Sequence, residues 1–209
     1  MDISRRQFMA AAGALAAAPA VLGDAQRVFK VGLVGCGGRG TGAIQNIMDA
    51  ATQLGCKVQL TAAADFFPEK AKAICMKYGV DEKMAFGGAN GYKNVIASGC
   101  EIVLLCTPPI FRPRQTAACV AAGKHIFAEK PIATDPRGLR EFLKAAAEAK
   151  AKNLSILSGT LHRHSNRFLK QIGPVRAGCI GKILAGRVYR CHGSMWVRPR
   201  RPKIGRAHV

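Results

Sequence analysis

Acidic residues are scarce in this chain, and its last quarter contains none. Asp and Glu number 12 against 32 Lys and Arg, the formal net charge is +20, and the last acidic residue is Glu148. Such an excess of positive charge is typical of nucleic-acid-binding proteins. Aromatic residues make up only 6% of the chain, however, and Trp196 and Tyr189 stand nearly alone near its end. Without aromatic platforms for bases, we expect no nucleic-acid partner.

Paired cysteines and long apolar runs are also absent. None of the eight cysteines forms a CxxC pair, and most stand inside apolar patterns, so we expect buried free thiols and no metal site. The weakly apolar run 10–22 is too short to cross a bilayer comfortably, which predicts no membrane span. No internal repeat is present.

The N-terminus has the features of an export signal. Arg5 and Arg6 precede the weakly apolar run, and the small residues Ala18-Pro19-Ala20 follow it as a cleavage motif. This order predicts a twin-arginine signal peptide over residues 1–26. The mature protein would then work in the periplasm or outside the cell, having folded and acquired any nucleotide in the cytoplasm.

From residue 28 onward, apolar runs of strand length alternate with amphipathic stretches. Further strands are expected at 57–64, 84–86, 101–106, 124–128 and 154–157, and helices at 41–54, 68–78, 92–97, 116–122 and 136–150. This alternation predicts an α/β fold of the Rossmann type, a doubly wound parallel sheet covered by helices on both faces. Its domain would span residues 27–158.

A cluster of glycines follows the first strand. Gly35, Gly37 and Gly40 have the spacing of the dinucleotide fingerprint, in which the first glycine allows a tight turn, the second admits the pyrophosphate, and the third lets helix and strand pack closely. The pyrophosphate would lie at the N-terminus of the next helix. Gly38 belongs to the same loop, and Arg39 would add a positive charge there.

Asp65 closes the second strand. A carboxylate at this place is expected to accept hydrogen bonds from the adenosine ribose of NAD. It would repel the additional phosphate of NADP, and no Arg immediately follows it. The sequence therefore predicts NAD as the cofactor, with NADP disfavoured.

Several short motifs follow one another along the chain. They are GCGGRG after the first strand, TPP after the fourth, AGKHIFAEKPIA, GTLHRH and GCIGKI. Together they resemble the glucose-fructose oxidoreductase, inositol dehydrogenase and rhizopine-catabolism family (Gfo/Idh/MocA). The most specific is AGKH-x-F-x-EKP, over residues 122–131, and the likeness covers 30–196. The resemblance implies NAD(P)-dependent hydride transfer to or from a sugar or polyol.

The resemblance also implies roles for particular residues. Lys130 would be the catalytic residue, beside the nicotinamide, where an ammonium can orient or relay the proton of the substrate hydroxyl. Glu129 would contact a cofactor amide or hydroxyl. The cofactor cleft would further be lined by Thr107, Pro108 and Arg163.

One position departs from the family pattern. Many relatives have a histidine a few residues after TPP, whereas Arg112 stands here, which leaves one usual cleft contact in doubt. Two other functions stay open. Some exported relatives resemble NAD-dependent glycoside hydrolases that recycle their nucleotide, and a non-catalytic sugar-binding protein would also carry these motifs.

The pattern changes after residue 158. A helix at 163–172 and a strand at 182–191 would begin an α+β second domain, over 159–209, for substrate binding and homo-oligomerisation. About fifty residues cannot enclose a useful core, and the tail 203–209 follows no family pattern. We therefore expect a truncated product that is inactive as it stands and exposes an unpaired strand.

Overall fold

The computed structural model describes residues 27–189, 191 and 193. The expected export signal and the tail 203–209 lie outside the described residues. The chain divides into two compact units, 1–161 and 162–209, which are described separately below.

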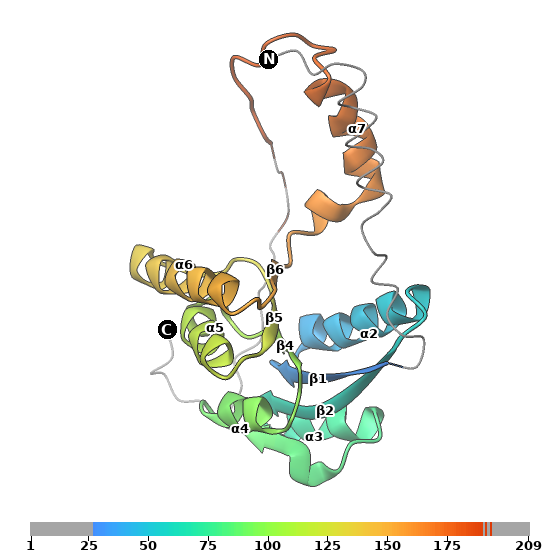
Figure 1. Ribbon diagram of the computed structural model, residues 1–209, viewed down its shortest axis with the longest axis vertical. Coiled ribbons are helices and arrows are strands. Elements are labelled where there is room, and N and C mark those ends of the chain that lie inside the picture. The colour runs from blue at the N-terminus through green and yellow to red at the C-terminus, as the bar shows by residue number, and fades with distance from the viewer. Residues whose placement is uncertain (1–26, 190, 192, 194–209) are drawn as a thin grey trace. The chain divides into compact units, whose positions relative to one another are not determined.

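Six parallel strands form one sheet in the first unit (Figure 1). They are β1 (Val28–Val34), β2 (Lys57–Asp65), β3 (Ala85–Gly87), β4 (Ile102–Leu105), β5 (His125–Ala128) and β6 (Ile156–Ser158). Their order is β3-β2-β1-β4-β5-β6, so the sheet grows outward in both directions from β1 and β4. This confirms the predicted doubly wound Rossmann sheet, with its topological switch point between those two strands.

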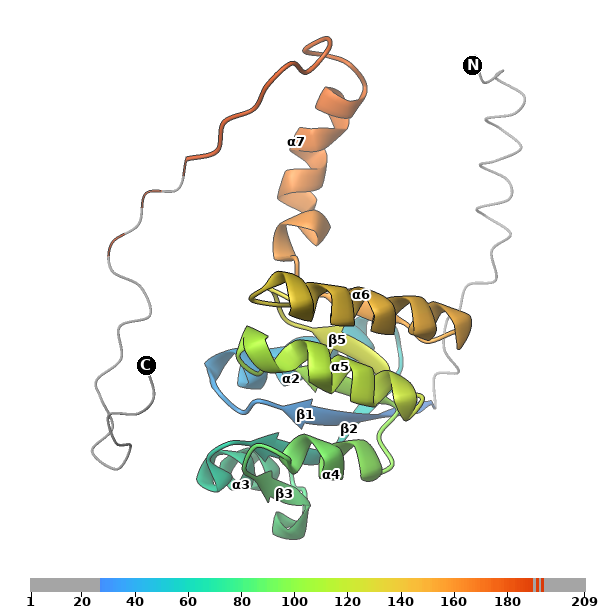
Figure 2. The ribbon, with the colours of Figure 1, turned by 90° about the vertical axis from the view of Figure 1, so that its left-hand side faces the viewer.

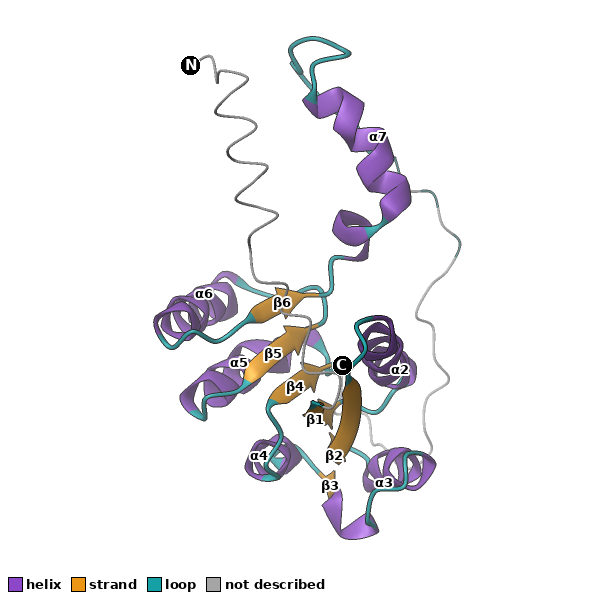
Figure 3. Cartoon of the chain, turned by 45° about the vertical axis from the view of Figure 1, so that its right-hand side comes forward, coloured by secondary structure: helices purple, strands orange, loops and turns teal. Residues whose placement is uncertain are grey.

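Helices cover both faces of this sheet, as Figure 3 shows. One face carries α2 (Gly38–Gln53) and α3 (Pro68–Lys77), and the other carries α4 (Gly91–Ala97), α5 (Arg112–Ala121) and α6 (Pro136–Ala151). Helices α5 and α6 lie side by side (Figure 2). Short 3-10 helices occur at η1 (Glu82–Met84) and η2 (Pro109–Phe111).

The central strands are apolar along their whole length because both of their faces are covered. In β4, Val103 and Leu105 pack toward α4, α5 and α6, whereas Leu104 packs toward α2 and α3. None of the three is more than 2% exposed. Each such side chain contributes roughly 1.5–3 kcal/mol by its burial, so the sheet that carries the site is well supported.

Two helices begin earlier than the sequence pattern predicts. Helix α2 begins at Gly38 rather than at residue 41, so the end of the glycine motif lies in its first turn. Helix α5 begins at Arg112 rather than at residue 116. Pro113 occupies its first turn, where a missing N–H costs no intrahelical hydrogen bond.

The second unit contains α7 (Asn166–Arg176), preceded by the 3-10 helix η3 (Leu161–His164). The predicted helix at 163–172 is thus present but shifted toward the C-terminus. The strand predicted at 182–191 is wrong for the described residues, since 182–189 have no strand structure. A strand needs a hydrogen-bonded neighbour, and no segment among the described residues pairs with 182–189. Leu184 and Val188 are 86% and 95% exposed.

All eight cysteines are free thiols. Cys36, Cys75, Cys100 and Cys119 are buried as expected, whereas Cys179 and Cys191 are exposed, contrary to expectation. In the described part of the chain, every helix is too short or too polar to cross a membrane.

Candidate nucleotide-binding site

The turn after β1 requires two of its glycines. Gly35 has φ of +96°, and a Cβ there would lie 2.6 Å from the carbonyl carbon of Cys106. A Cβ on Gly40 would come within 1.8 Å of the Gly35 carbonyl oxygen. The first and third glycines therefore allow the tight turn and the close approach of α2 to β1, as the fingerprint predicts.

The second glycine faces open space. A Cβ on Gly37 would meet no atom of the protein within 4 Å, so the backbone can be approached closely here. Gly37 is also the N-cap of α2, which has neither a side-chain cap hydrogen bond nor an acidic residue in its first turn. The N–H groups at Gly38 and beyond are left for an anion, to which the helix dipole adds attraction.

Asp65 lies at the end of β2, beside this turn. Its Oδ2 accepts a hydrogen bond from the Cys36 N–H at 2.8 Å, and its Oδ1 accepts one from the Phe67 N–H at 3.0 Å. Each carboxylate oxygen retains a further lone pair. Asp65 is therefore held in place while it can still accept from a hydroxyl group, which is the predicted ribose contact.

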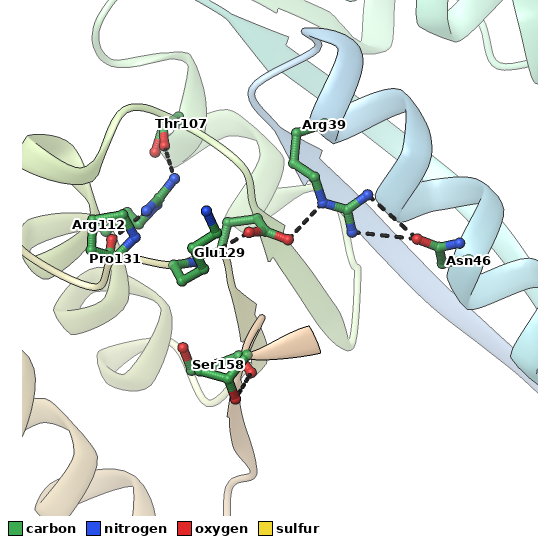
Figure 4. A network of polar contacts seen from close by, with 9 residues as sticks. Arg39, Asn46, Thr107, Arg112, Glu129, Pro131 and Ser158 are labelled. Atoms are coloured by element: carbon green, nitrogen blue, oxygen red, sulfur yellow. Dashed lines mark hydrogen bonds and ion pairs between the residues drawn. The ribbon is translucent and has the colours of Figure 1, made fainter. Parts of the chain in front are cut away.

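Glu129 follows β5 and is buried, with 8% of its side chain exposed. Its Oε1 accepts from Arg39 Nε at 2.6 Å, and its Oε2 accepts from the Lys130 N–H at 3.1 Å (Figure 4). The guanidinium of Arg39 also contacts Asn46 Oδ1 at 3.4 Å. Two side chains that were predicted separately as cofactor contacts are thus bonded to each other.

The carboxylate of Glu129 also lies close to Gly159, in the loop after β6. A Cβ on Gly159 would lie 2.7 Å from Glu129 Oε1 and 3.0 Å from its Oε2. The site therefore needs a glycine at the end of β6. Sequence analysis did not select Gly159, although a glycine just after an apolar strand is a signal of close backbone approach.

Arg112 has a role that sequence analysis missed. Its side chain is 5% exposed and donates from Nη1 to the Pro131 carbonyl oxygen and from Nη2 to the Thr107 carbonyl oxygen, as Figure 4 shows. Burial lowers the pKa of its guanidinium, while Glu129 acts in the opposite direction. Arg112 thus ties the loop after β4 to the loop after β5, and it does not replace a histidine in an open cleft.

The remaining predicted residues lie in the same loops or outside the first unit. Thr107 is half-buried and donates from Oγ1 to Gln115 Oε1 at 2.6 Å, and Pro108 is exposed beside it. Lys130 is exposed and precedes Pro131 through a cis peptide bond. Arg163 lies in η3, in the second unit, so its cofactor contact stays a prediction.

These elements meet because parallel strands end at one edge of their sheet. The residues after β1, β2, β4, β5 and β6 supply the glycine turn, Asp65, Thr107, Glu129 with Lys130, and Gly159. In open α/β sheets this edge, at the switch point, binds ligands. The described residues contain no cluster of three or more metal-ligating side chains.

Two curated relatives indicate the chemistry of similar proteins. Over 146 residues the chain is 30% identical to inositol 2-dehydrogenase of Rhizobium meliloti, covering 69% of this chain and 41% of that enzyme. It is 26% identical over 172 residues to a glycosyl hydrolase family 109 protein of Shewanella amazonensis, covering 80% of this chain and 36% of the relative. The chain thus spans less than half of each relative.

Solved structures have the same fold. Scyllo-inositol dehydrogenase from Lactobacillus casei, with bound NAD(H) and scyllo-inositol, superposes with a TM-score of 0.63 at 25% identity, over 74% of this chain and 43% of that one. A solved structure from Sinorhizobium meliloti, named as a putative myo-inositol dehydrogenase, superposes with a TM-score of 0.58 at 27% identity, over 73% of this chain and 42% of that one.

Two family models match separate parts of the chain. Residues 2–21 match the signal sequence of the twin-arginine translocation pathway, which confirms the predicted export to the periplasm or beyond. Residues 29–156 match the oxidoreductase family with an NAD-binding Rossmann fold, which is the family that the EKP motif and the glycine turn predict. The chain belongs to this Gfo/Idh/MocA oxidoreductase family.

Proposed function

We propose that the protein transfers hydride between NAD and a sugar or polyol. The observation that carries this proposal is the meeting of Glu129 and Lys130 with the fingerprint turn at one edge of the sheet, through the Arg39–Glu129 bond of 2.6 Å. The match to inositol 2-dehydrogenase supports a polyhydroxylated substrate. The substrate itself and the activity of the whole protein are part of the proposal.

The residues present fit a dinucleotide. The uncapped start of α2 and the open side of Gly37 would take the pyrophosphate, and Asp65 would take the adenosine ribose. Because Asp65 is a carboxylate whose two oxygens are oriented by N–H groups, it favours ribose hydroxyls over a ribose phosphate. The proposed cofactor is therefore NAD in preference to NADP.

Lys130 is the proposed proton-handling residue. Its ammonium forms no hydrogen bond or ion pair with the rest of the described chain and is exposed at the carboxyl edge of the sheet, so it can donate to a substrate oxygen. When bound, the nicotinamide supplies a hydride acceptor. Lys130 would orient the hydroxyl group and take or relay its proton, while Glu129 and Arg112 hold the loop that carries it.

A second function has a specific observation in its favour. The match to a glycosyl hydrolase family 109 protein covers 80% of this chain, and an exported enzyme meets no cytoplasmic nicotinamide pool. A hydrolase that holds and recycles its nucleotide would need none. The Rossmann unit serves either reaction, because both begin by oxidation of a sugar carbon.

One set of assays separates these functions. The purified full-length protein is first analysed for bound nucleotide by mass spectrometry and absorbance. It is then incubated with inositols and free sugars plus NAD, and with chromogenic glycosides without NAD. Net NADH formation supports the dehydrogenase, and aglycone release without added NAD supports the hydrolase. Binding of NAD with neither reaction would leave a sugar-binding protein, and lack of NAD binding would overturn the proposal.

We also propose the domain limits 27–158 and 159–209, with homo-oligomerisation through the second domain. The division of the chain into units at residue 161 supports such a boundary. Light scattering of the protein with and without residues 159–209 tests the role in assembly. An unchanged mass per particle would contradict it.

A further inference from the structure

The bond between Arg39 and Glu129 joins two places that the nucleotide would contact separately. Arg39 lies in the first turn of α2, where the pyrophosphate is expected, and Glu129 follows β5, on the nicotinamide side. The two residues are 90 positions apart, and the bond is 2.6 Å long. Within the described chain, Glu129 has no other ion pair.

Glu129 depends on the ion pair more than Arg39 does, because its side chain is more deeply buried. The carboxylate of Glu129 has 8% of its side chain exposed, and a buried charge without a partner is costly. The side chain of Arg39 is 45% exposed. Its terminal nitrogens make only the 3.4 Å contacts to Asn46, so the guanidinium is open to a stronger acceptor such as a phosphate.

Glu129 transmits its position to the catalytic loop. Its second oxygen accepts from the Lys130 N–H at 3.1 Å, and its carboxylate occupies the space that a Cβ at Gly159 would need. A change at Arg39 therefore reaches the backbone of Lys130 through a single side chain.

We propose that Arg39 is a positioning residue that couples phosphate binding to Glu129 and Lys130. Before the nucleotide binds, Arg39 holds Glu129; the pyrophosphate then competes for the guanidinium and frees the carboxylate for the nicotinamide half. The inference rests on the proposed function and deepens it.

A double-mutant cycle read by ADP binding tests this coupling. ADP carries the pyrophosphate but no nicotinamide, so Glu129 can affect its binding only through Arg39 or through long-range charge. Calorimetry gives the Kd of ADP for the unmutated chain, Arg39→Gln, Glu129→Gln and the double variant. We expect Glu129→Gln to bind ADP about fivefold or more tightly than the unmutated chain, because Arg39 is released.

In the Arg39→Gln background, Glu129→Gln should change the Kd by less than about twofold. If Glu129→Gln tightened ADP binding equally with and without Arg39→Gln, the effect would be due to long-range charge, and the coupling would be overturned. No tightening of ADP binding in either background would also overturn it. Failure of the unmutated chain to bind both ADP and NAD would overturn the proposed function itself. The two failures are therefore distinct.

Glu101→Gln is the matched control. Glu101 also accepts from an arginine and from a backbone N–H, but it precedes β4, at the opposite edge of the sheet, so the same change of charge should leave ADP binding unaltered. Thermal unfolding without nucleotide gives a second readout. Arg39→Gln should lower the Tm by leaving a buried carboxylate unpaired, and adding Glu129→Gln should restore it; additive losses would contradict the inference.

Discussion

The backbone N–H of Cys36 donates to Asp65 Oδ2 at 2.8 Å, which ties the glycine turn after β1 to the end of β2. Together with the Phe67 N–H on Oδ1, this bond orients the carboxylate before any ribose arrives. A preorganised acceptor loses less entropy on binding. The relationship makes Asp65 the natural place to test cofactor choice.

Asp65→Asn should narrow the preference for NAD over NADP. The amide keeps one oxygen that can accept but removes the charge that repels the 2′-phosphate, so the Kd of NADP should fall relative to that of NAD. Calorimetric titrations of both nucleotides measure the ratio, with Asp49→Asn on the exposed side of α2 as the control. Tighter binding of NADP than of NAD by the unmutated protein would contradict the assignment.

Gly40→Ala should affect stability, whereas Gly37→Ala should affect nucleotide binding. A methyl group at residue 40 would meet the Gly35 carbonyl oxygen, so unfolding should become easier by about 2 kcal/mol or more. A methyl group at residue 37 meets nothing in the protein, and it should leave stability nearly unchanged while weakening NAD binding. Urea unfolding and calorimetry of both variants separate the two roles; equal destabilisation would show that Gly37 is structural.

In the full-length enzyme, Lys130→Met should lower kcat by about a hundredfold or more while sparing the Kd of NAD. The reason is that the ammonium handles the proton of the substrate and does not hold the nucleotide. Steady-state kinetics on the sugar or polyol that the substrate assays identify, with NAD binding measured in parallel, distinguish an effect on kcat from an effect on the Kd of NAD. Near-normal turnover of the variant would show that Lys130 is an ordinary surface lysine without a catalytic role.

Asp135 caps α6 and should make stability depend on acid pH. Its Oδ1 accepts from the Gly138 N–H at 2.8 Å, and this bond lowers the pKa of the carboxyl below its ordinary value of 3.8. A lowered pKa contributes stability above the unfolded value, and the contribution is lost as the pH falls through the folded value. Between about pH 5 and about pH 3, the Tm of the Asp135→Asn variant should therefore fall by less than the Tm of the unmutated chain. An equal fall of Tm in both proteins would contradict this prediction.

The sheet could be predicted from the sequence because its signals are local. A few consecutive residues are enough to indicate the buried strand β4 and the glycine turn after β1. The expected ends of most elements lie close to those observed. The start of α5 was missed because Pro113 resembles a loop residue unless it is placed in the first turn of a helix. The strand expected at 182–191 failed for another reason, since pairing with a neighbour is not a property of one segment.

The members of the candidate site could be selected from the sequence, but the contacts between them could not. Glycine spacing and the EKP motif select the candidate residues, whereas the Arg39–Glu129 bond and the hydrogen bonds of Arg112 join segments that are distant in sequence. Such contacts depend on the register of the sheet. Gly159 was overlooked because the group that requires a glycine there, the carboxylate of Glu129, lies in the loop after another strand, β5.

The burial of the thiols matters because the protein is exported to an oxidising compartment. Burial raises the pKa of Cys119 to about 12, and a thiol that does not ionise neither attacks a disulfide nor reacts readily with oxidants. Because twin-arginine export moves a chain that has already folded, these sulfurs enter an oxidising compartment inside a finished core. Folding before crossing thus decides the redox fate of the protein: the interior sulfurs stay reduced, and Cys179 and Cys191, both exposed, are the ones that an oxidant meets.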